Sequence, residues 1–130
     1  MKVLQISTVC GSGSVGRITV DIYHTLKSCG DEGLIAYGRR QAPEGVEAFR
    51  FGSDLDMGFH VLSTFFRGEH GFASTGQTRK LIEKIREWDP DVIHLHNIHG
   101  FILQVEELFS YLKQAGKPVV WTLHDCWPYT

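Results

Sequence analysis

Short apolar runs recur along the chain and predict the strands of a sheet. In the first run, Val3, Leu4 and Ile6 leave little room for polar side chains, which is typical of a strand that helices cover on both faces. Four later runs predict further strands at residues 33–37, 46–51, 92–96 and 119–124. The run at 46–51 alternates between apolar and charged residues over part of its length, so we place this strand nearer the edge of the sheet.

Between the strands, apolar residues at three- and four-residue spacing predict helices. In the first helix, from Gly16 to about Ser28, we expect Ile18, Ile22 and Leu26 to face the sheet. Similar patterns predict helices over about 55–66, from 74 or 75 to 87, and over 102–115.

The predicted elements follow the order strand, helix, two strands, two helices, strand, helix and strand. This alternation favours an α/β fold, a Rossmann-like three-layer domain with a mainly parallel sheet and right-handed crossovers. No internal repeat, linker or low-complexity run divides the sequence, so residues 1–130 are predicted to form one domain.

Composition narrows the class of protein. Hydrophobic residues make up 42% of the 130 residues and charged residues 22%, as in an ordinary soluble domain. The formal net charge of −2 argues against a general nucleic-acid binder, which usually carries a basic face. No apolar run approaches the ~20 residues needed to span a bilayer, and no secretory leader precedes the first strand. We therefore expect a cytoplasmic protein.

An aromatic segment adds a second expectation about location. Phe65, Phe66 and Phe72 flank a short polar stretch in this segment. These side chains either belong to the core or form an exposed apolar rim that contacts an acceptor or a membrane surface. Peripheral contact with the inner face of the membrane is therefore a prediction for this segment.

The three cysteines, Cys10, Cys29 and Cys126, form no Cys-x-x-Cys pair. Their odd number fits neither a disulfide framework nor a zinc knuckle, and buried or incidental thiols explain them best. Cys10 borders a predicted helix N-terminus, which lowers the pKa of a thiol, so a catalytic role for it is the alternative.

A glycine-rich loop, residues 11–16, joins the first strand to the first helix. With so little side-chain bulk, its backbone N–H groups can approach an anionic or sugar-like ligand at the helix N-terminus. The alternative is a plain tight turn. Arg39 and Arg40 follow the second strand at the edge where ligands bind in open α/β sheets, and they are either phosphate contacts or a solvated surface.

Histidines gather at the ends of two predicted strands. His94, His96 and His99 lie at the end of the strand at 92–96, and His124 precedes Asp125 after the last strand. Because the carboxyl ends of parallel strands meet in one crevice, His96 and His124 can share a site. His94 fits a hydrogen-bonded core histidine. Neither His-x-His nor His-Asp has a diagnostic metal spacing, so we predict no metal site.

Three sequence segments together resemble the amino-terminal domain of family 4 glycosyltransferases. They are VLQISTVCGSGSVGR, DPDVIHLHNIHG and KPVVWTLHDCWPYT, and HLHNIHG and TLHDCW are the most specific parts. The family consists of retaining enzymes of the GT-B fold, in which two Rossmann-like domains face each other across a cleft. The resemblance is strongest to bacterial members that build capsular or extracellular polysaccharide.

The resemblance implies roles for particular residues. Arg17 would pair with an anionic group, and His124, the predicted catalytic residue, would contact donor-sugar hydroxyls near the reacting carbon. Asn97 and Asp125 would bind sugar hydroxyls, while His96 and His99 would line the acceptor side. The phosphate or acceptor loop would consist of Gly11, Ser12, Gly13, Ser14 and Gly16.

The resemblance also implies substrates and a missing part. A nucleotide-sugar would serve as co-substrate with no separate cofactor, and a saccharide or lipid-linked molecule as acceptor. The family's Glu-x7-Glu motif, which binds the nucleotide-sugar in a carboxyl-terminal donor domain, has no counterpart in this sequence. We therefore expect residues 1–130 to be a shortened, acceptor-side domain that is inactive alone.

Two other functions remain open at this level. Gly11–Gly16 matches the Gly-x-Gly-x-x-Gly dinucleotide fingerprint, and Arg39 and Arg40 replace the acid expected after the second strand. This combination would suit an NADP-binding oxidoreductase. The third candidate is a non-catalytic, partner-binding remnant.

Overall fold

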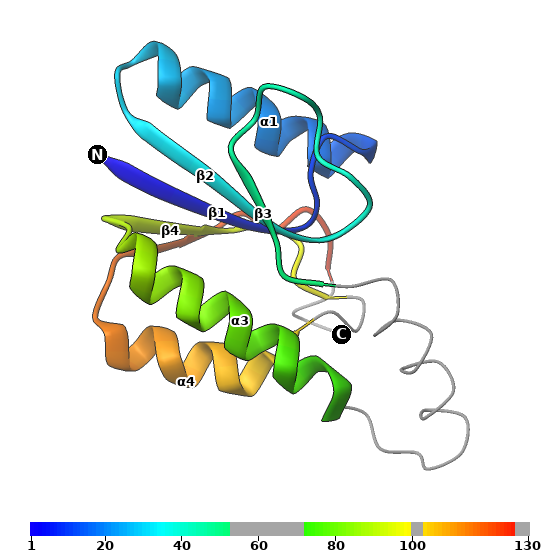
Figure 1. Ribbon diagram of the computed structural model, residues 1–130, viewed down its shortest axis with the longest axis vertical. Coiled ribbons are helices and arrows are strands. Elements are labelled where there is room, and N and C mark those ends of the chain that lie inside the picture. Colours follow the sequence, from blue (N-terminus) through cyan, green and yellow to red (C-terminus); the bar gives the residue numbers. More distant parts are fainter. Residues whose placement is uncertain (53–71, 100–102, 127–130) are drawn as a thin grey trace.

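The computed structural model describes residues 1–52, 72–99 and 103–126 and contains a five-stranded parallel sheet in this part of the chain (Figure 1). The strands lie in the order β3-β2-β1-β4-β5. Their bounds are β1 Lys2–Val9, β2 Glu32–Arg39, β3 Ala48–Arg50, β4 Val92–Leu95 and β5 Val119–Trp121. The described helices are α1 Gly13–Ser28, α3 Phe72–Trp88 and α4 Val105–Ala115. The α/β, Rossmann-like class predicted from the sequence is confirmed.

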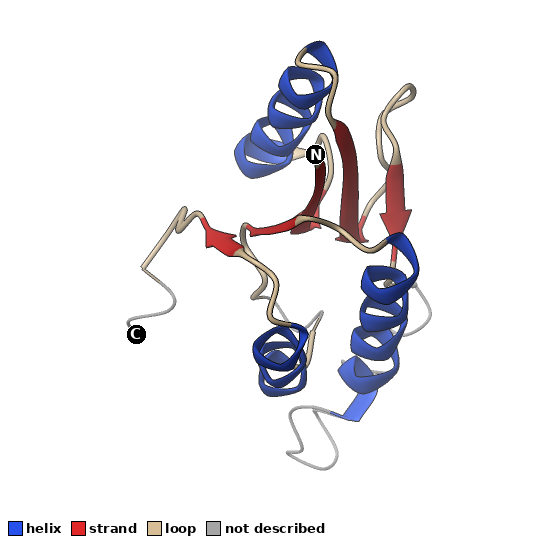
Figure 2. Cartoon of the chain, turned by 90° about the vertical axis from the view of Figure 1, so that its left-hand side faces the viewer, coloured by secondary structure: helices blue, strands red, loops and turns tan. Residues whose placement is uncertain are grey.

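The helices form two layers around the sheet. α1 covers one face, and α3 and α4 cover the other (Figures 1 and 2). On the α3–α4 side, Leu4 and Ile6 of β1 pack with Leu81 and Ile85 of α3 and Leu108 of α4, all of them buried. This packing buries the apolar stripe of each helix, as an amphipathic pattern predicts.

The other side of β1 is polar. Gln5 and Ser7 point away from the Leu4–Ile6 core, because successive strand residues alternate between faces, and both are fully buried. The prediction that β1 has little room for polar side chains is therefore wrong for this face. Gln5 lies opposite His94 in the β1–β4 register, which places a polar group beneath α1.

α1 differs from its prediction in both start and face. It begins at Gly13, three residues early, and buries Gly16, Thr19 and Tyr23, whereas Ile18 is 39% exposed. The expectation that Ile18 faces the sheet is wrong. Gly16 allows the start of α1 to approach the glycine loop closely, because a Cβ there would lie only 3.0 Å from the backbone N of Gly11.

Other elements are shorter than their predictions at the ligand-facing end. β4 ends at Leu95 and β5 at Trp121, so His96 and His124 follow the strands instead of completing them. α4 begins at Val105, after buried Leu103, and β3 spans three residues. The predicted helix over 55–66 and the aromatic segment at Phe65 and Phe66 lie outside the described residues.

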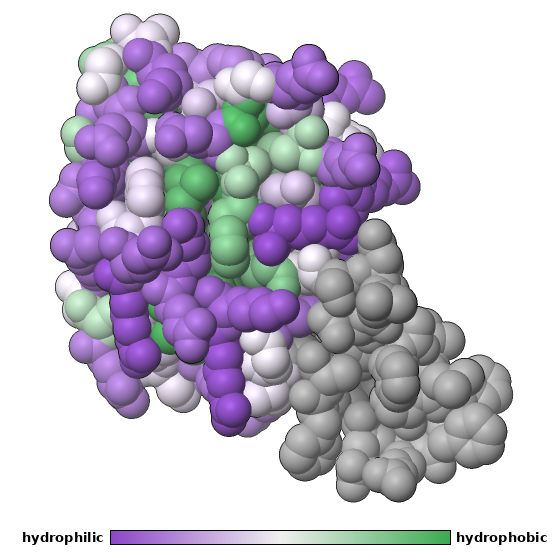
Figure 3. Space-filling model, viewed as in Figure 1, coloured by the Kyte–Doolittle hydropathy of each residue, from purple (hydrophilic) through white to green (hydrophobic). Residues whose placement is uncertain are grey.

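The molecular surface is largely hydrophilic in the view of Figure 3, with a narrow hydrophobic strip between polar side chains. Among the described helices, none combines the length and the apolar character that crossing a bilayer requires.

Candidate functional site

A pocket of about 290 Å³ lies at the carboxyl end of the sheet. Its walls come from the ends of β1 and β2, the start of α1 and the loop after β4. Ligands bind at this edge in open α/β sheets, since loops from neighbouring strands converge there. Its lining residues are Ser7, Thr8, Val9, Ser12, Gly13, Ser14, Val15, Arg39, Asn97 and His99.

The glycine loop forms a tight turn beside this pocket. Gly11 and Gly13 have φ angles of 72° and 68°, which favour glycine, and the Gly11 N–H donates to the carbonyl of Gly16 over 2.8 Å. A Cβ on Gly11 would lie 2.7 Å from Cδ of Pro43. Ser12, Gly13 and Ser14 line the pocket, whereas Gly11 and Gly16 shape the turn behind them.

The N-terminus of α1 is left without a side-chain cap. Ser12 occupies the N-cap position but makes no capping hydrogen bond, and its hydroxyl accepts one from Nη1 of Arg40 at 2.9 Å instead. No acidic residue lies in the first turn. Uncapped N–H groups and the helix dipole together favour an anion at this position, and Arg39 adds a guanidinium to the pocket wall.

Ser7 contributes a buried hydroxyl to the pocket wall. Within the described residues, its Oγ has no hydrogen-bond partner. An unpaired buried hydroxyl is costly, so a ligand group that reached Ser7 would satisfy it. Ser7 is not among the site residues predicted from the sequence, although the polar positions within the apolar run at 3–6 and just after it were the available signal.

The loop after β4 supplies Asn97 and His99, and β1 fixes its position. The Thr8 hydroxyl donates to the carbonyl oxygens of Asn97 and His99 over 2.8 and 3.2 Å. Nε2 of His99 lies 2.7 Å from Oδ2 of Asp125, which joins this loop to the segment after β5. The structure therefore brings together Asn97, His99 and Asp125 at the edge of the sheet where the shared-crevice argument expected His96 and His124 to meet, and adds Thr8 as an unexpected support.

His96 has a different place from the one expected. Its side chain is fully buried beneath the loop, so it does not reach the surface on which we expected it to line the acceptor side. Its Nε2 lies 3.0 Å from Oε1 of Gln5, and its Nδ1 lies 3.0 Å from Nε2 of His124. Burial, with smaller contributions from nearby His94 and His124, lowers the pKa of His96 to about 3. His96 and His124 thus meet, but as a hydrogen-bonded pair.

The remaining predicted residues lie around this centre. His124 is half-buried and lies outside the residues that line the pocket, and Arg17 is exposed on α1. His94 is half-buried and its Nε2 lies 2.8 Å from the Thr122 hydroxyl, consistent with the core role expected for it. Burial, followed by the charge of His124, lowers the pKa of His94.

The thiol of Cys10 is not activated. Cys10 is buried, and this burial raises the pKa of its thiol to about 11, which disfavours the nucleophilic thiolate. Cys10 is thus a buried thiol, as expected from the sequence, and the alternative of a catalytic thiol activated by the helix N-terminus gains no support. All three cysteines are free. In the described ranges, no group of three or more His, Cys, Asp or Glu side chains is arranged to hold a metal ion.

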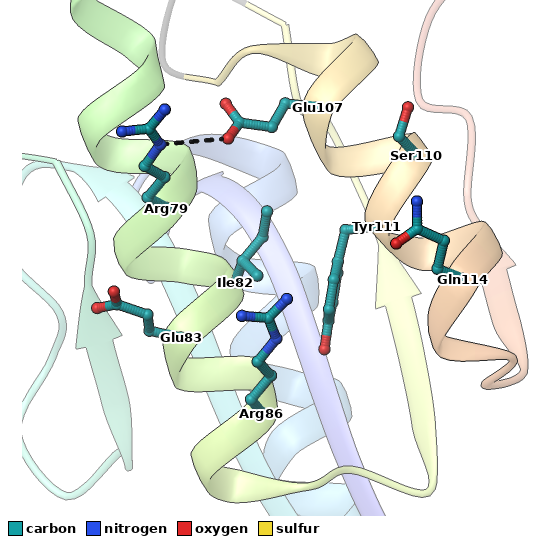
Figure 4. A pocket seen from close by; sticks show the side chains of 8 residues that line it. All are labelled: Arg79, Ile82, Glu83, Arg86, Glu107, Ser110, Tyr111 and Gln114. Atoms are coloured by element: carbon teal, nitrogen blue, oxygen red, sulfur yellow. Dashed lines mark ion pairs between the residues drawn. The ribbon is translucent and has the colours of Figure 1, made fainter.

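A second pocket, of about 590 Å³, lies between α3 and α4 (Figure 4). Its two arginines have partners in the wall itself: Arg79 lies 3.5 Å from a Glu107 oxygen, and the Arg86 guanidinium lies 5.1 Å from the Tyr111 ring centroid. The charges of both signs favour no single class of charged ligand. The pocket at the carboxyl end of the sheet is the better candidate site.

Comparisons with known proteins show the family and the fold of this chain. The model of Glycosyltransferase Family 4 matches residues 15–130, which include Asn97, His99 and His124 and begin just after Ser14. The chain is similar to the crystal structure of SsfS6, a Streptomyces sp. SF2575 glycosyltransferase, with a TM-score of 0.60 and 16% sequence identity. The similarity covers 95% of this chain and 39% of SsfS6. No curated protein matches the chain significantly.

Proposed function

Because the chain belongs to glycosyltransferase family 4, we propose that it forms part of an enzyme that transfers a sugar from a nucleotide-sugar to an acceptor. The observation that carries this proposal is the pocket in which the start of α1 and the loop after β4 meet. The wall at the start of α1 suits an anion, and the wall formed by the loop after β4 suits hydroxyl groups. A nucleotide-sugar presents both kinds of group, and so does a phosphate-bearing acceptor.

The anionic side of the ligand faces α1 in this proposal. Uncapped N–H groups of the first turn and the Arg39 guanidinium bind phosphate, and the Ser7 hydroxyl gains a partner. These preorganised groups stabilise negative charge that develops on a departing nucleotide. Holding the reacting groups in place supplies the rest of the acceleration, so the reaction needs no cofactor beyond the nucleotide-sugar.

The sugar side of the ligand faces the loop after β4. Asn97 and His99 line the pocket there, and Asp125 holds His99 by the 2.7 Å contact. Amide, imidazole and carboxylate groups together offer donors and acceptors, which a sugar's many hydroxyls require. His124, the proposed catalytic residue, contacts the donor sugar near the reacting carbon, with retention of configuration.

The wider activity depends on more than this pocket. The chain spans about 39% of the length of the similar solved glycosyltransferase, and we propose that a donor-binding domain faces this pocket in the complete enzyme. Residues 1–130 alone are then expected to show no appreciable turnover. We further propose that the acceptor is a saccharide or a lipid-linked molecule and that the complete enzyme takes part in the synthesis of capsular or extracellular polysaccharide. It would act at the cytoplasmic face of the membrane.

Titration of the ¹⁵N-labelled chain with uridine diphosphate, guanosine diphosphate and NADPH tests this function. At least one nucleoside diphosphate is expected to shift the amide signals of Gly13, Ser14 and Asn97. Arg39→Gln should weaken that response several-fold, because it removes a positive charge from the pocket wall. Arg79→Gln, which removes the same charge from the α3–α4 pocket, is the matched control and should leave the response unchanged.

Two outcomes would contradict the proposal. Shifts confined to α3 and α4 would place the ligand in the other pocket. Tighter binding of NADPH than of either diphosphate, lost in Arg39→Ala, would favour the dinucleotide-binding alternative.

A further inference from the structure

A buried path of hydrogen bonds leads from α1 to His124. It begins at the backbone carbonyl of Thr19, which accepts from Nε2 of Gln5 over 2.9 Å. A carbonyl oxygen only accepts hydrogen bonds, so the amide nitrogen of Gln5 must face Thr19. The amide oxygen of Gln5 therefore faces the other way, toward His96.

The orientation of Gln5 decides which nitrogen of His96 carries a proton. Oε1 of Gln5 lies 3.0 Å from Nε2 of His96, and an amide oxygen only accepts, so Nε2 of His96 is the N–H. His96 is fully buried, which favours the neutral ring. A neutral imidazole carries a single N–H, and Nδ1 of His96 is consequently a bare acceptor.

The bare nitrogen of His96 in turn acts on His124. Nδ1 of His96 lies 3.0 Å from Nε2 of His124, so Nε2 of His124 must donate. The two ring planes are inclined by 19° and their centroids lie 5.3 Å apart. The centroid separation exceeds the nitrogen–nitrogen distance by about the centroid-to-nitrogen radius of both rings together. The two nitrogens therefore lie close to the line that joins the centroids, and the hydrogen bond lies near the plane of each ring. That is the geometry of a directed hydrogen bond rather than of face-to-face packing.

We propose that Gln5 and His96 are positioning residues that hold His124 with its proton on Nε2, so that Nδ1 accepts a hydrogen bond from a substrate hydroxyl. The part about substrate rests on the proposed function. Within the described part of the chain, Nδ1 of His124 makes no hydrogen bond, and the side chain is half-buried beyond the end of β5. The orientation of the Thr19 carbonyl, passed on through Gln5 and His96, thus determines which ring nitrogen of His124 can accept a hydrogen bond.

The same path explains why polar residues are buried in β1 and after β4. If positions 5 and 96 carried apolar side chains instead of Gln5 and His96, this space would be filled with no buried donors or acceptors that need a partner. Every link between Thr19 and His124 is instead paired with one partner of the opposite kind, at distances of 2.9, 3.0 and 3.0 Å. A fully paired buried network favours one arrangement of its side chains, which a positioning role requires.

Ring-nitrogen NMR of the ¹⁵N-histidine-labelled chain tests the proposal at neutral pH. In the unmodified chain, Nε2 of both His96 and His124 is expected to give the shift of a protonated nitrogen, and Nδ1 that of a bare one. Gln5→Met keeps the size of the side chain but removes the amide. It should move the His124 nitrogen shifts toward the average of the two tautomers.

Thr122→Val is the matched control, because it removes a hydrogen bond from His94 outside the path. It should leave the His124 shifts unchanged. A His124 protonated on Nδ1 in the unmodified chain would overturn the proposal even if Gln5→Met did not fold. Unchanged His124 shifts in a folded Gln5→Met protein would overturn it as well. These spectra need no substrate, so failure of nucleotide binding with the expected tautomers would count against the proposed function alone.

Discussion

The hydroxyl of Thr8 donates a hydrogen bond to the backbone carbonyl of Asn97 over 2.8 Å. The backbone N–H of Thr8 donates to the same oxygen over 2.9 Å, so the end of β1 holds the loop after β4 through two groups. This contact fixes one wall of the pocket relative to the glycine loop, which continues from the same strand.

Thr8→Val tests this support, since valine has nearly the same shape without the hydroxyl. The backbone hydrogen bond remains, so we expect the free energy of unfolding to fall by only about 1 kcal/mol. Nucleotide-induced shifts at Asn97 should weaken more than stability does. Thr25→Val removes a similar hydrogen bond, to Asp21 of α1, away from the pocket, and should affect stability alone. Equal loss of nucleotide response in both variants would contradict a role for Thr8 at the site.

Ser7→Ala separates stability from ligand binding at the pocket wall. Because the Ser7 hydroxyl is buried without a described partner, its removal should leave the free energy of unfolding unchanged or raise it by up to about 1 kcal/mol. Binding of a nucleoside diphosphate should weaken, since the ligand loses a donor. Chemical denaturation and NMR titration of the same variant measure both effects. A marked loss of stability together with unchanged binding would show that Ser7 has only a structural role.

Three glycine-to-alanine variants distinguish backbone strain from crowding. Gly13→Ala should cost about 1–2 kcal/mol of stability, because φ is 68° although nothing lies within 4 Å of the new Cβ. Gly11→Ala should cost more, since its Cβ would also crowd Pro43. Gly76→Ala, in α3 with open space around it, should instead stabilise the protein by up to about 1 kcal/mol. Urea unfolding gives the order, and an equal effect at Gly11 and Gly13 would show that Pro43 moves aside.

The buried His96 should make the free energy of unfolding depend on pH. The pKa of the folded state is about 3 and that of an unfolded histidine about 6.5, so the unfolded chain binds an extra proton between these values. The contribution of His96 to the free energy of unfolding is fully present above about pH 6.5. As the pH is lowered from there to about 3, this contribution decreases by up to about 1.4 kcal/mol for each pH unit. His96→Gln should flatten the curve in that range, although His94, whose pKa burial also lowers, contributes a part that remains.

Exposed His24 on α1 provides the control for this measurement. His24→Gln removes a histidine from the surface and should keep the slope of the unmodified protein. Urea unfolding at several pH values between 4 and 7 gives the slope for each variant. A His96→Gln protein with the original slope would mean that His96 is not held neutral in the folded state.

The amino-acid sequence by itself determined the α/β class, the order of the described elements and the edge of the sheet at which polar residues gather. Periodicity was sufficient because buried strands and amphipathic helices have different spacings of apolar residues, and both hydrophobic clusters of the sheet draw on such residues. The meeting of His96 and His124 was also predictable, since carboxyl ends of parallel strands share one edge.

Only the tertiary structure decided which way individual polar side chains point. α1 buries Gly16, Thr19 and Tyr23 and leaves Ile18 exposed, and the close approach of Gly16 to Gly11 is a contact that the apolar pattern ignores. The roles of Gln5 and His96 depend on partners that are distant in sequence and approach within 3.0 Å across the sheet. A hydrogen bond requires direction as well as proximity, and this direction arises only when three segments of the chain pack together.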